Sequence, residues 1–227
     1  MSVSLAGLYN AGYMITMTYA GMVFAAMETD YYPHLSAVCH DTKKMNGATN
    51  RQIEVSLIII APMLVALMLG VNVLSPLLFC GKFVPVVGMT QIAVMAMYFR
   101  AINLPVAYIM LAKGDSKSYL LMEAVYDVLI VVCIILGYSN WGLEGTGIAL
   151  AVASFVDTTC VLFYCGWKYE FDIAGGLTKN FMLQLLLGIA TLAVVKLAGS
   201  LAYWCLGLPL FAASAALSLK MYKNLGR

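Results

Sequence analysis

Long apolar runs separated by short polar segments occupy the whole chain. The runs extend over about residues 5–27, 53–79, 84–112, 119–138, 145–167, 181–199 and 203–219. Most are as long as the roughly 18–20 residues that carry a helix across a bilayer. The pattern predicts an all-α fold, a polytopic membrane bundle of about seven transmembrane helices. Only residues 200–202 separate the last two runs, which form a tight hairpin if both cross.

The composition agrees with this pattern. Hydrophobic residues make up 63% of the chain and charged residues 11%, whereas an ordinary soluble domain carries roughly 25% charged residues. Mean hydropathy is +0.89. These values exclude a water-soluble domain, and the formal net charge of +2 gives no reason to expect nucleic-acid binding.

The basic residues are distributed very unevenly between the two sides of the predicted bundle. With seven crossings the connecting loops alternate sides, and one side receives only Lys82. The other side collects Lys43, Lys44, Arg51, Lys113, Lys117, Lys168, Lys179, Lys220, Lys223 and Arg227. Because Lys and Arg concentrate in cytoplasmic loops, we expect a cytoplasmic C-terminus and an external N-terminus. The first residues, MSVSLAGLYNAGYMITMTYAG, lack the basic region of a signal peptide, so we expect the chain to be the C-terminal part of a larger protein.

Four charged residues lie deep inside the apolar runs. They are Arg100, Glu123, Asp127 and Asp157. A charge near the bilayer centre costs roughly 2.5–3.5 kcal/mol on insertion scales, so such residues usually face a bundle interior or a wet cavity. Glu123 and Asp127 are four residues apart, which places them on one helix face.

Two neighbours of Arg100 strengthen the case for a cavity. Asn103 adds a polar group, and Pro105 removes a backbone donor, so it is predicted to break the helix one turn after Arg100. We expect one of the three acids to hold Arg100 at rest and to release it to a substrate; alternatively, the ion pair only packs the bundle. The predicted substrate-binding residues are Arg100, Asn103, Glu123, Asp127 and Asp157.

Other motifs favour packing over chemistry. The six cysteines are scattered without a CxxC pair, which indicates packing residues or free thiols, and neither a metal site nor a cofactor is predicted. The glycines of WGLEGTG, at 142, 145 and 147, favour close helix packing. Lys196 is expected to snorkel to the outer interface. In DTKKMNGATNRQIEV, the second half is expected to be a short helix on the membrane surface.

The order of these pieces resembles a known family. GLYNAGYMITMTYAGMVFAAMETDYYPHLSAV, the basic loop, LLFCGKFVPVV, YFRAINLPVAYIMLAKGDSKSYLLMEAVYDV and WGLEGTGIALAVAS are similar to the C-terminal half of Wzx-type O-antigen flippases. These belong to the multidrug, oligosaccharidyl-lipid and polysaccharide exporter superfamily. The resemblance covers about residues 4–168. It implies one lobe of a two-lobed exporter, with residues 1–170 as the lobe core of about five helices and 171–227 as two further helices and a cytoplasmic tail.

The resemblance also implies a function. Such flippases move undecaprenyl-pyrophosphate-linked oligosaccharide, for example an O-antigen repeat of lipopolysaccharide, across the bacterial inner membrane by alternating access of two lobes. Cavity arginines of the superfamily engage the anionic head, and the resemblance implies this part for Arg100. The implied partners are the lipid-linked oligosaccharide, membrane lipids and an N-terminal lobe or partner chain; the coupling ion, proton or sodium, is left open.

Three other functions compete with this interpretation. A multidrug or cation exporter of the same superfamily would use an acidic cation site, which Asp127 and Asp157 can supply. An integral membrane glycan-processing enzyme would need a sizeable extramembrane loop, and the outer loops have only a few residues, so no enzymatic activity is predicted. The third alternative is an inactive truncated remnant, because a single lobe offers no opposing wall for alternating access.

Overall fold

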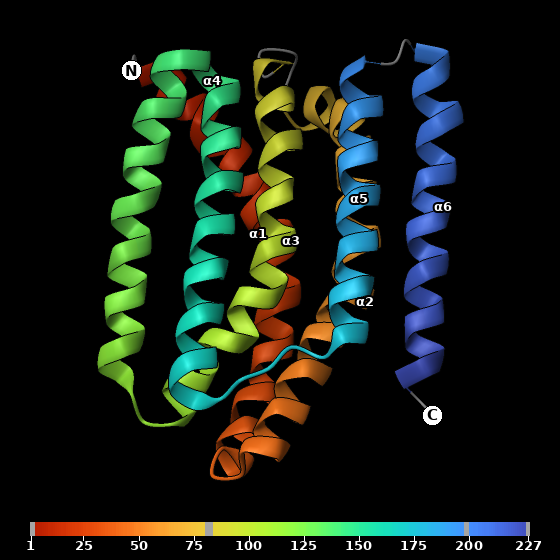
Figure 1. Ribbon diagram of the computed structural model, residues 1–227. Coiled ribbons are helices and arrows are strands. Elements are labelled where there is room, and N and C mark those ends of the chain that lie inside the picture. Colours follow the sequence, from red (N-terminus) through yellow and green to blue (C-terminus); the bar gives the residue numbers. More distant parts are fainter. Residues whose placement is uncertain (1–2, 80–83, 198–199, 226–227) are drawn as a thin grey trace.

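The computed structural model describes residues 3–79, 84–197 and 200–225. Over these residues the chain forms α-helices joined by short connections (Figure 1). The helices are α1 (Val3–Val38), α2 (Thr42–Phe79), α3 (Val84–Ala112), α4 (Ser116–Tyr169), α5 (Gly175–Leu197) and α6 (Ser200–Leu225). The all-α bundle predicted from the hydropathy pattern is confirmed. Cys80, Lys82, Gly199 and Arg227, which entered the sequence analysis, lie outside the described residues.

Helix α4 consists of two antiparallel arms joined by a sharp bend (Figure 1). The bend lies at Trp141 and Gly142, whose backbone angles are not helical. We call residues 116–140 the first arm and residues 143–169 the second arm. With α4 counted as two arms, seven helical stretches are present, and the two chain ends lie at opposite ends of the bundle (Figure 1). Five of the described helices, all but α1, are long and apolar enough to cross a membrane.

Glycines make the bend possible. Gly142 has φ +60° and ψ −140°, a backbone conformation that is essentially restricted to glycine. Beside the bend, a Cβ on Gly137 would lie 2.3 Å from the carbonyl oxygen of Gly145, and a Cβ on Gly147 would lie 2.6 Å from the carbonyl oxygen of Met89 in α3. The packing role predicted for Gly145 and Gly147 is thus confirmed, whereas Gly142 forms the turn.

The open ends of the two arms are joined by polar side chains. Asp115 caps the first arm by accepting from the Ser118 backbone amide at 3.2 Å, and it also forms an ion pair with Lys168 of the second arm. The Tyr169 hydroxyl donates to the same carboxylate at 2.6 Å. The Lys168 ammonium, followed by Tyr169 and Ser118, holds the pKa of Asp115 well below its usual range, and Asp115 in turn raises the pKa of Lys168.

Helix α3 is the central element, packed against α1, α2, α4 and α5. Its side chains Tyr98, Ile109 and Met110 are fully buried. The helix continues through Pro105 to Ala112, so the predicted break is wrong. The carbonyl oxygen of Pro105 accepts a hydrogen bond of 2.8 Å from the buried Tyr31 hydroxyl of α1, which ties the proline region to its neighbour.

Three smaller expectations are corrected or confirmed. The basic segment is helical from Thr42 onward and continuous with α2, so no separate surface helix exists. Lys196, which is expected to snorkel, also forms an ion pair: its ammonium lies 2.6 Å from the Glu144 carboxylate at the start of the second arm. The described cysteines are free thiols, as predicted: Cys39, Cys133, Cys160, Cys165 and Cys205.

Candidate substrate-binding site

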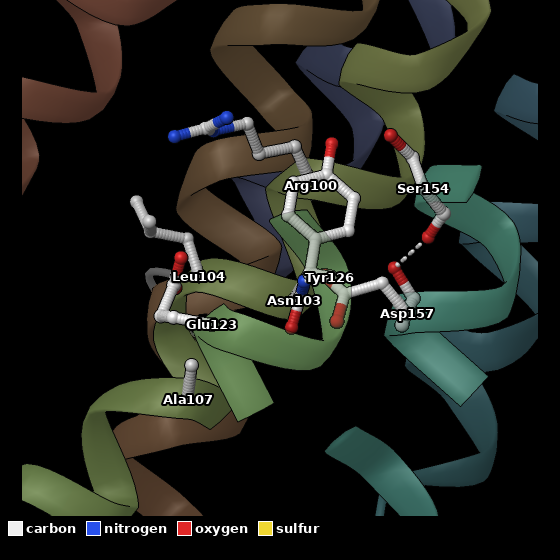
Figure 2. Close-up of a pocket in the computed structure, with 9 residues that line it drawn as sticks. Arg100, Asn103, Leu104, Ala107, Glu123, Tyr126, Ser154 and Asp157 are labelled. Carbon is white, nitrogen blue, oxygen red and sulfur yellow. Dashed lines mark hydrogen bonds between the residues drawn. The ribbon is translucent and has the colours of Figure 1, made fainter. Parts of the chain in front are cut away.

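Three helical stretches converge on a small polar cavity of about 40 Å³ (Figure 2). Each stretch contributes residues at helical spacing, so each presents one stripe of its surface. Helix α3 contributes positions 100, 103, 104 and 107, the first arm of α4 contributes 123 and 126, and the second arm contributes 154, 157 and 158. The cavity is therefore built between the two arms of α4 and the central helix. Its lining is Arg100, Asn103, Leu104, Ala107, Glu123, Tyr126, Ser154, Asp157 and Thr158.

Four of the five predicted site residues come together here. Arg100, Asn103, Glu123 and Asp157 line the cavity, whereas Asp127 lies exposed on the first arm and is not part of the lining. The sequence analysis missed three polar members of the site. Ser154 lies three residues before Asp157, and Tyr126 lies three residues after Glu123, so a spacing of three residues from a charge in an apolar run is the signal that identifies them. Thr158 directly follows Asp157 and lacks this signal.

Asp157 is held by an amide and not by the arginine. Asn103 donates a short hydrogen bond from its side-chain nitrogen to the Asp157 carboxylate. Its side-chain oxygen is buried and has no partner among the described residues. The cavity therefore contains an amide oxygen without a donor, beside a half-buried carboxylate.

Arg100 takes a different direction from the one predicted. Its guanidinium extends away from Asp157 (Figure 2), and one terminal nitrogen lies 4.0 Å from the sulfur of Met17 in α1. Within the part of the chain that the structure describes, Arg100 forms no ion pair. The predicted resting pair with Glu123, Asp127 or Asp157 is thus wrong, because the shorter Asn103 side chain, one turn further along α3, occupies Asp157 instead.

Among the described residues, this arrangement leaves the Arg100 guanidinium without an ion-pair partner and the Asn103 side-chain oxygen without a donor. The guanidinium offers five N–H groups in a planar fork that matches phosphate or carboxylate oxygens. Glu123, Asp157 and the free Asn103 oxygen are acceptors that suit a cation, a proton or hydroxyl donors. Unpaired polar groups at membrane depth are tolerated only beside water or a ligand, so the site is suited to a ligand with both an anionic group and hydroxyls.

Comparisons with known proteins found a family that matches part of the chain and a solved structure with a similar fold. Residues 1–88 match a protein family described as "polysaccharide biosynthesis protein". This match covers α1, α2 and the start of α3, and it ends before the first residue of the cavity. No curated protein sequence matches the chain.

Among solved structures, the chain is similar to the lipid II flippase MurJ in an inward closed conformation. The TM-score is 0.63 at 15% sequence identity, over 94% of this chain and 48% of the flippase chain. At this identity the likeness concerns the fold, and the chain spans about half the length of the flippase. The family match covers residues 1–88 of 227, and the structural likeness shows a shared helical membrane fold; neither identifies a Wzx-type flippase.

Proposed function

We propose that this chain is one lobe of a flippase that moves undecaprenyl-pyrophosphate-linked oligosaccharide, such as an O-antigen repeat, across the bacterial inner membrane. The observation that carries the proposal is a guanidinium without a carboxylate partner among the described residues, placed in a polar cavity between long apolar helices. The flippase-like fold and the partial family match support it. The C-terminus is proposed to lie in the cytoplasm.

The chemistry of such a substrate fits the cavity on two counts. Pyrophosphate oxygens match the planar fork of Arg100 bidentately. Sugar hydroxyls donate to carboxylate and amide oxygens, which Glu123, Asp157 and Asn103 supply. Asp127, exposed on the same arm, is proposed to face the path that the sugars take outside the cavity.

A second lobe is part of the proposal. Alternating access needs two bodies that rock around one site, and the chain spans about half of the flippase it resembles. We therefore assign residues 1–170 to the core of one lobe and residues 171–227 to two further helices. The opposing wall is supplied by an N-terminal lobe or a partner chain.

A cation exporter of the same superfamily is the second candidate. The observation that favours it is the number of acids: Glu123 and Asp157 line the cavity against one arginine. In that case the acids bind the transported cation, and Arg100 stabilises their negative charge without contacting the substrate.

Substitution of Arg100 separates these candidates. Arg100→Ala, introduced at the native locus, is expected to abolish glycan export, because the anionic head loses its donor. Arg100→Lys keeps the charge but loses the planar fork, so we expect at least a tenfold loss of export. Surface glycan is measured together with the amount of protein in the membrane.

The matched controls are Arg51→Ala and Arg51→Lys, at an exposed position of α2. Both should export glycan at the wild-type level. If Arg100→Ala is present at normal levels and still exports glycan, the assignment of Arg100 to the pyrophosphate is wrong. Export of a lipophilic cation that requires Glu123 but not Arg100 would favour the second candidate.

A further inference from the structure

A second cavity lies on the other side of Thr158 from the polar one. It has a volume of about 170 Å³ and is bounded by α2, α3, the second arm of α4 and the start of α5. Its buried walls include Ile53, Ile102, Leu177 and Phe181. The rings of Phe99 and Phe181 meet edge-on at 6.2 Å between centroids and form its aromatic side. The proposed transport cycle uses none of these residues except Thr158.

The walls of this cavity present carbon almost everywhere. Two of its three threonines turn their hydroxyls back onto helix carbonyls: Thr159 donates to Phe155 at 2.8 Å, and Thr158 donates to Ser154 at 2.7 Å. Both threonines line the cavity. A buried water needs two to four polar partners, and apolar cavities of roughly 150 Å³ stay dry and accept apolar molecules. The natural occupant is therefore a hydrocarbon.

The cavity opens at the lipid-facing surface of the bundle. Phe155 and Met182, which lie at its mouth, are 54% and 51% exposed, whereas the opposite walls are buried. These exposed faces belong to helices that are long and apolar enough to cross a membrane. The solvent at this mouth is thus the acyl-chain region of the bilayer.

The position along the bundle indicates which part of a lipid enters. The lining residues of α5, Leu177 to Met182, lie in its first two turns, within about 12 Å of the helix start at 1.5 Å per residue. Ile173, in the connection that precedes α5, closes the cavity at that end. Lys179 is exposed between these positions, at a level where it can meet a phosphate headgroup.

We infer that this cavity binds one fatty acyl chain of a membrane phospholipid, with the headgroup beside the start of α5. The bound chain fills space that the protein leaves empty between α5 and the α2–α3–α4 core, and it therefore supports the seating of the α5–α6 pair. Packing contacts with the chain replace the dispersion contacts that an empty void forfeits. The site is independent of the transported lipid and of the proposed flippase function.

A photoreactive phospholipid tests this inference. The probe is a phosphatidylglycerol with a diazirine on its acyl chain, incorporated into membranes that contain the full chain and no polyprenyl lipid. After illumination, labelled peptides are mapped by mass spectrometry. Labelling is expected to concentrate on peptides containing Phe155, Leu162 or Phe181 and to saturate as the probe concentration rises.

Two tryptophan variants provide the matched pair. Thr159→Trp fills the cavity and should lower this labelling at least fivefold. Cys160→Trp adds the same ring at the next, exposed position outside the cavity and should leave labelling unchanged. Equal labelling of both variants, or labelling that rises without saturation and is spread over all lipid-facing helices, overturns the inference. If Thr159→Trp does not fold, the saturation behaviour of the wild-type chain decides in the same way.

Discussion

The two arms of α4 are both apolar and nearly equal in length, yet they have opposite roles. The second arm buries a stripe that starts with Gly145 and includes Ala149, Leu150 and Ala153. In the first arm, Gly137 is the buried residue, and Leu121 and Val128 are 64% and 66% exposed. The second arm therefore holds the bundle together, and the first arm presents a surface.

The difference arises from small residues. Gly145 and Ala149 lie against Gly137 of the first arm, and Gly147 lies against Met89 of α3, so these small residues let the second arm approach both neighbours closely. The first arm carries branched apolar residues on its outer faces and adds two carboxylates, Glu123 and Asp127. Hydropathy alone does not separate the arms, because lipid tails and protein interiors are equally apolar.

The largest expected loss of stability comes from adding a side chain where the two arms of α4 lie closest together. In Gly145→Leu, the new Cβ would lie 1.9 Å from the backbone oxygen of Gly137. Because the backbone must move, we expect the loss of folding stability to exceed the roughly 1–3 kcal/mol of ordinary overpacking. The variant should therefore give no monodisperse protein on gel filtration. Gly47→Leu, on α2 where nothing lies within 4 Å, is the matched control. A normal Gly145→Leu profile would refute the tight hairpin.

Two leucine-to-alanine substitutions compare the buried face of the second arm with the exposed face of the first arm. Leu150→Ala removes a side chain that is 2% exposed and should lower stability by roughly 2 kcal/mol, the low end of core truncations. The value is at the low end because the side chain is transferred between two apolar surroundings, lipid and protein, and not from water. Leu121→Ala, on the exposed face of the first arm, should change stability by less than about 0.5 kcal/mol. Thermal unfolding in detergent measures both. Equal losses would mean that the first arm is packed against protein in the isolated chain.

The sequence predicts part of this comparison and misses the rest for physical reasons. The hydropathy pattern identifies all seven helical stretches. Charges within apolar runs identify three of the nine cavity residues, and the polar neighbour Asn103 is a fourth. The partner of each charge does not follow from sequence, since it depends on side-chain length and direction: Asn103 reaches Asp157, whereas Arg100 points towards Met17. The helix through Pro105 was also missed, because neighbouring helices can donate hydrogen bonds to carbonyls near a proline, as the Tyr31 hydroxyl does to Pro105.

A smaller effect on thermal stability is expected from the ion pair between Asp115 and Lys168, which joins the open ends of the arms. The lowered pKa of Asp115 means that its contribution is present above the usual carboxyl pKa and is lost as pH falls below about 4. The raised pKa of Lys168 keeps its contribution through alkaline pH, until pH rises through that raised value. Asp115→Asn should therefore lower the melting temperature slightly at neutral pH and flatten the fall in acid.

Asp172→Asn, at a nearby exposed carboxylate, is the control for this prediction. It should keep the wild-type dependence of melting temperature on pH. If Asp115→Asn and Asp172→Asn give the same curve as the wild type, the ion pair between Asp115 and Lys168 contributes nothing to closing the arms.

We propose that the charged stripe of the first arm, Glu123 and Asp127, faces a water-filled path and that its apolar stripe faces lipid. Single cysteines at positions 121, 123, 127 and 128, all exposed in the structure, test it in an otherwise cysteine-free protein in native membranes. The measurement is the rate of reaction with a charged maleimide. We expect positions 123 and 127 to react at least tenfold faster than positions 121 and 128. Equal rates at all four positions would contradict the claim.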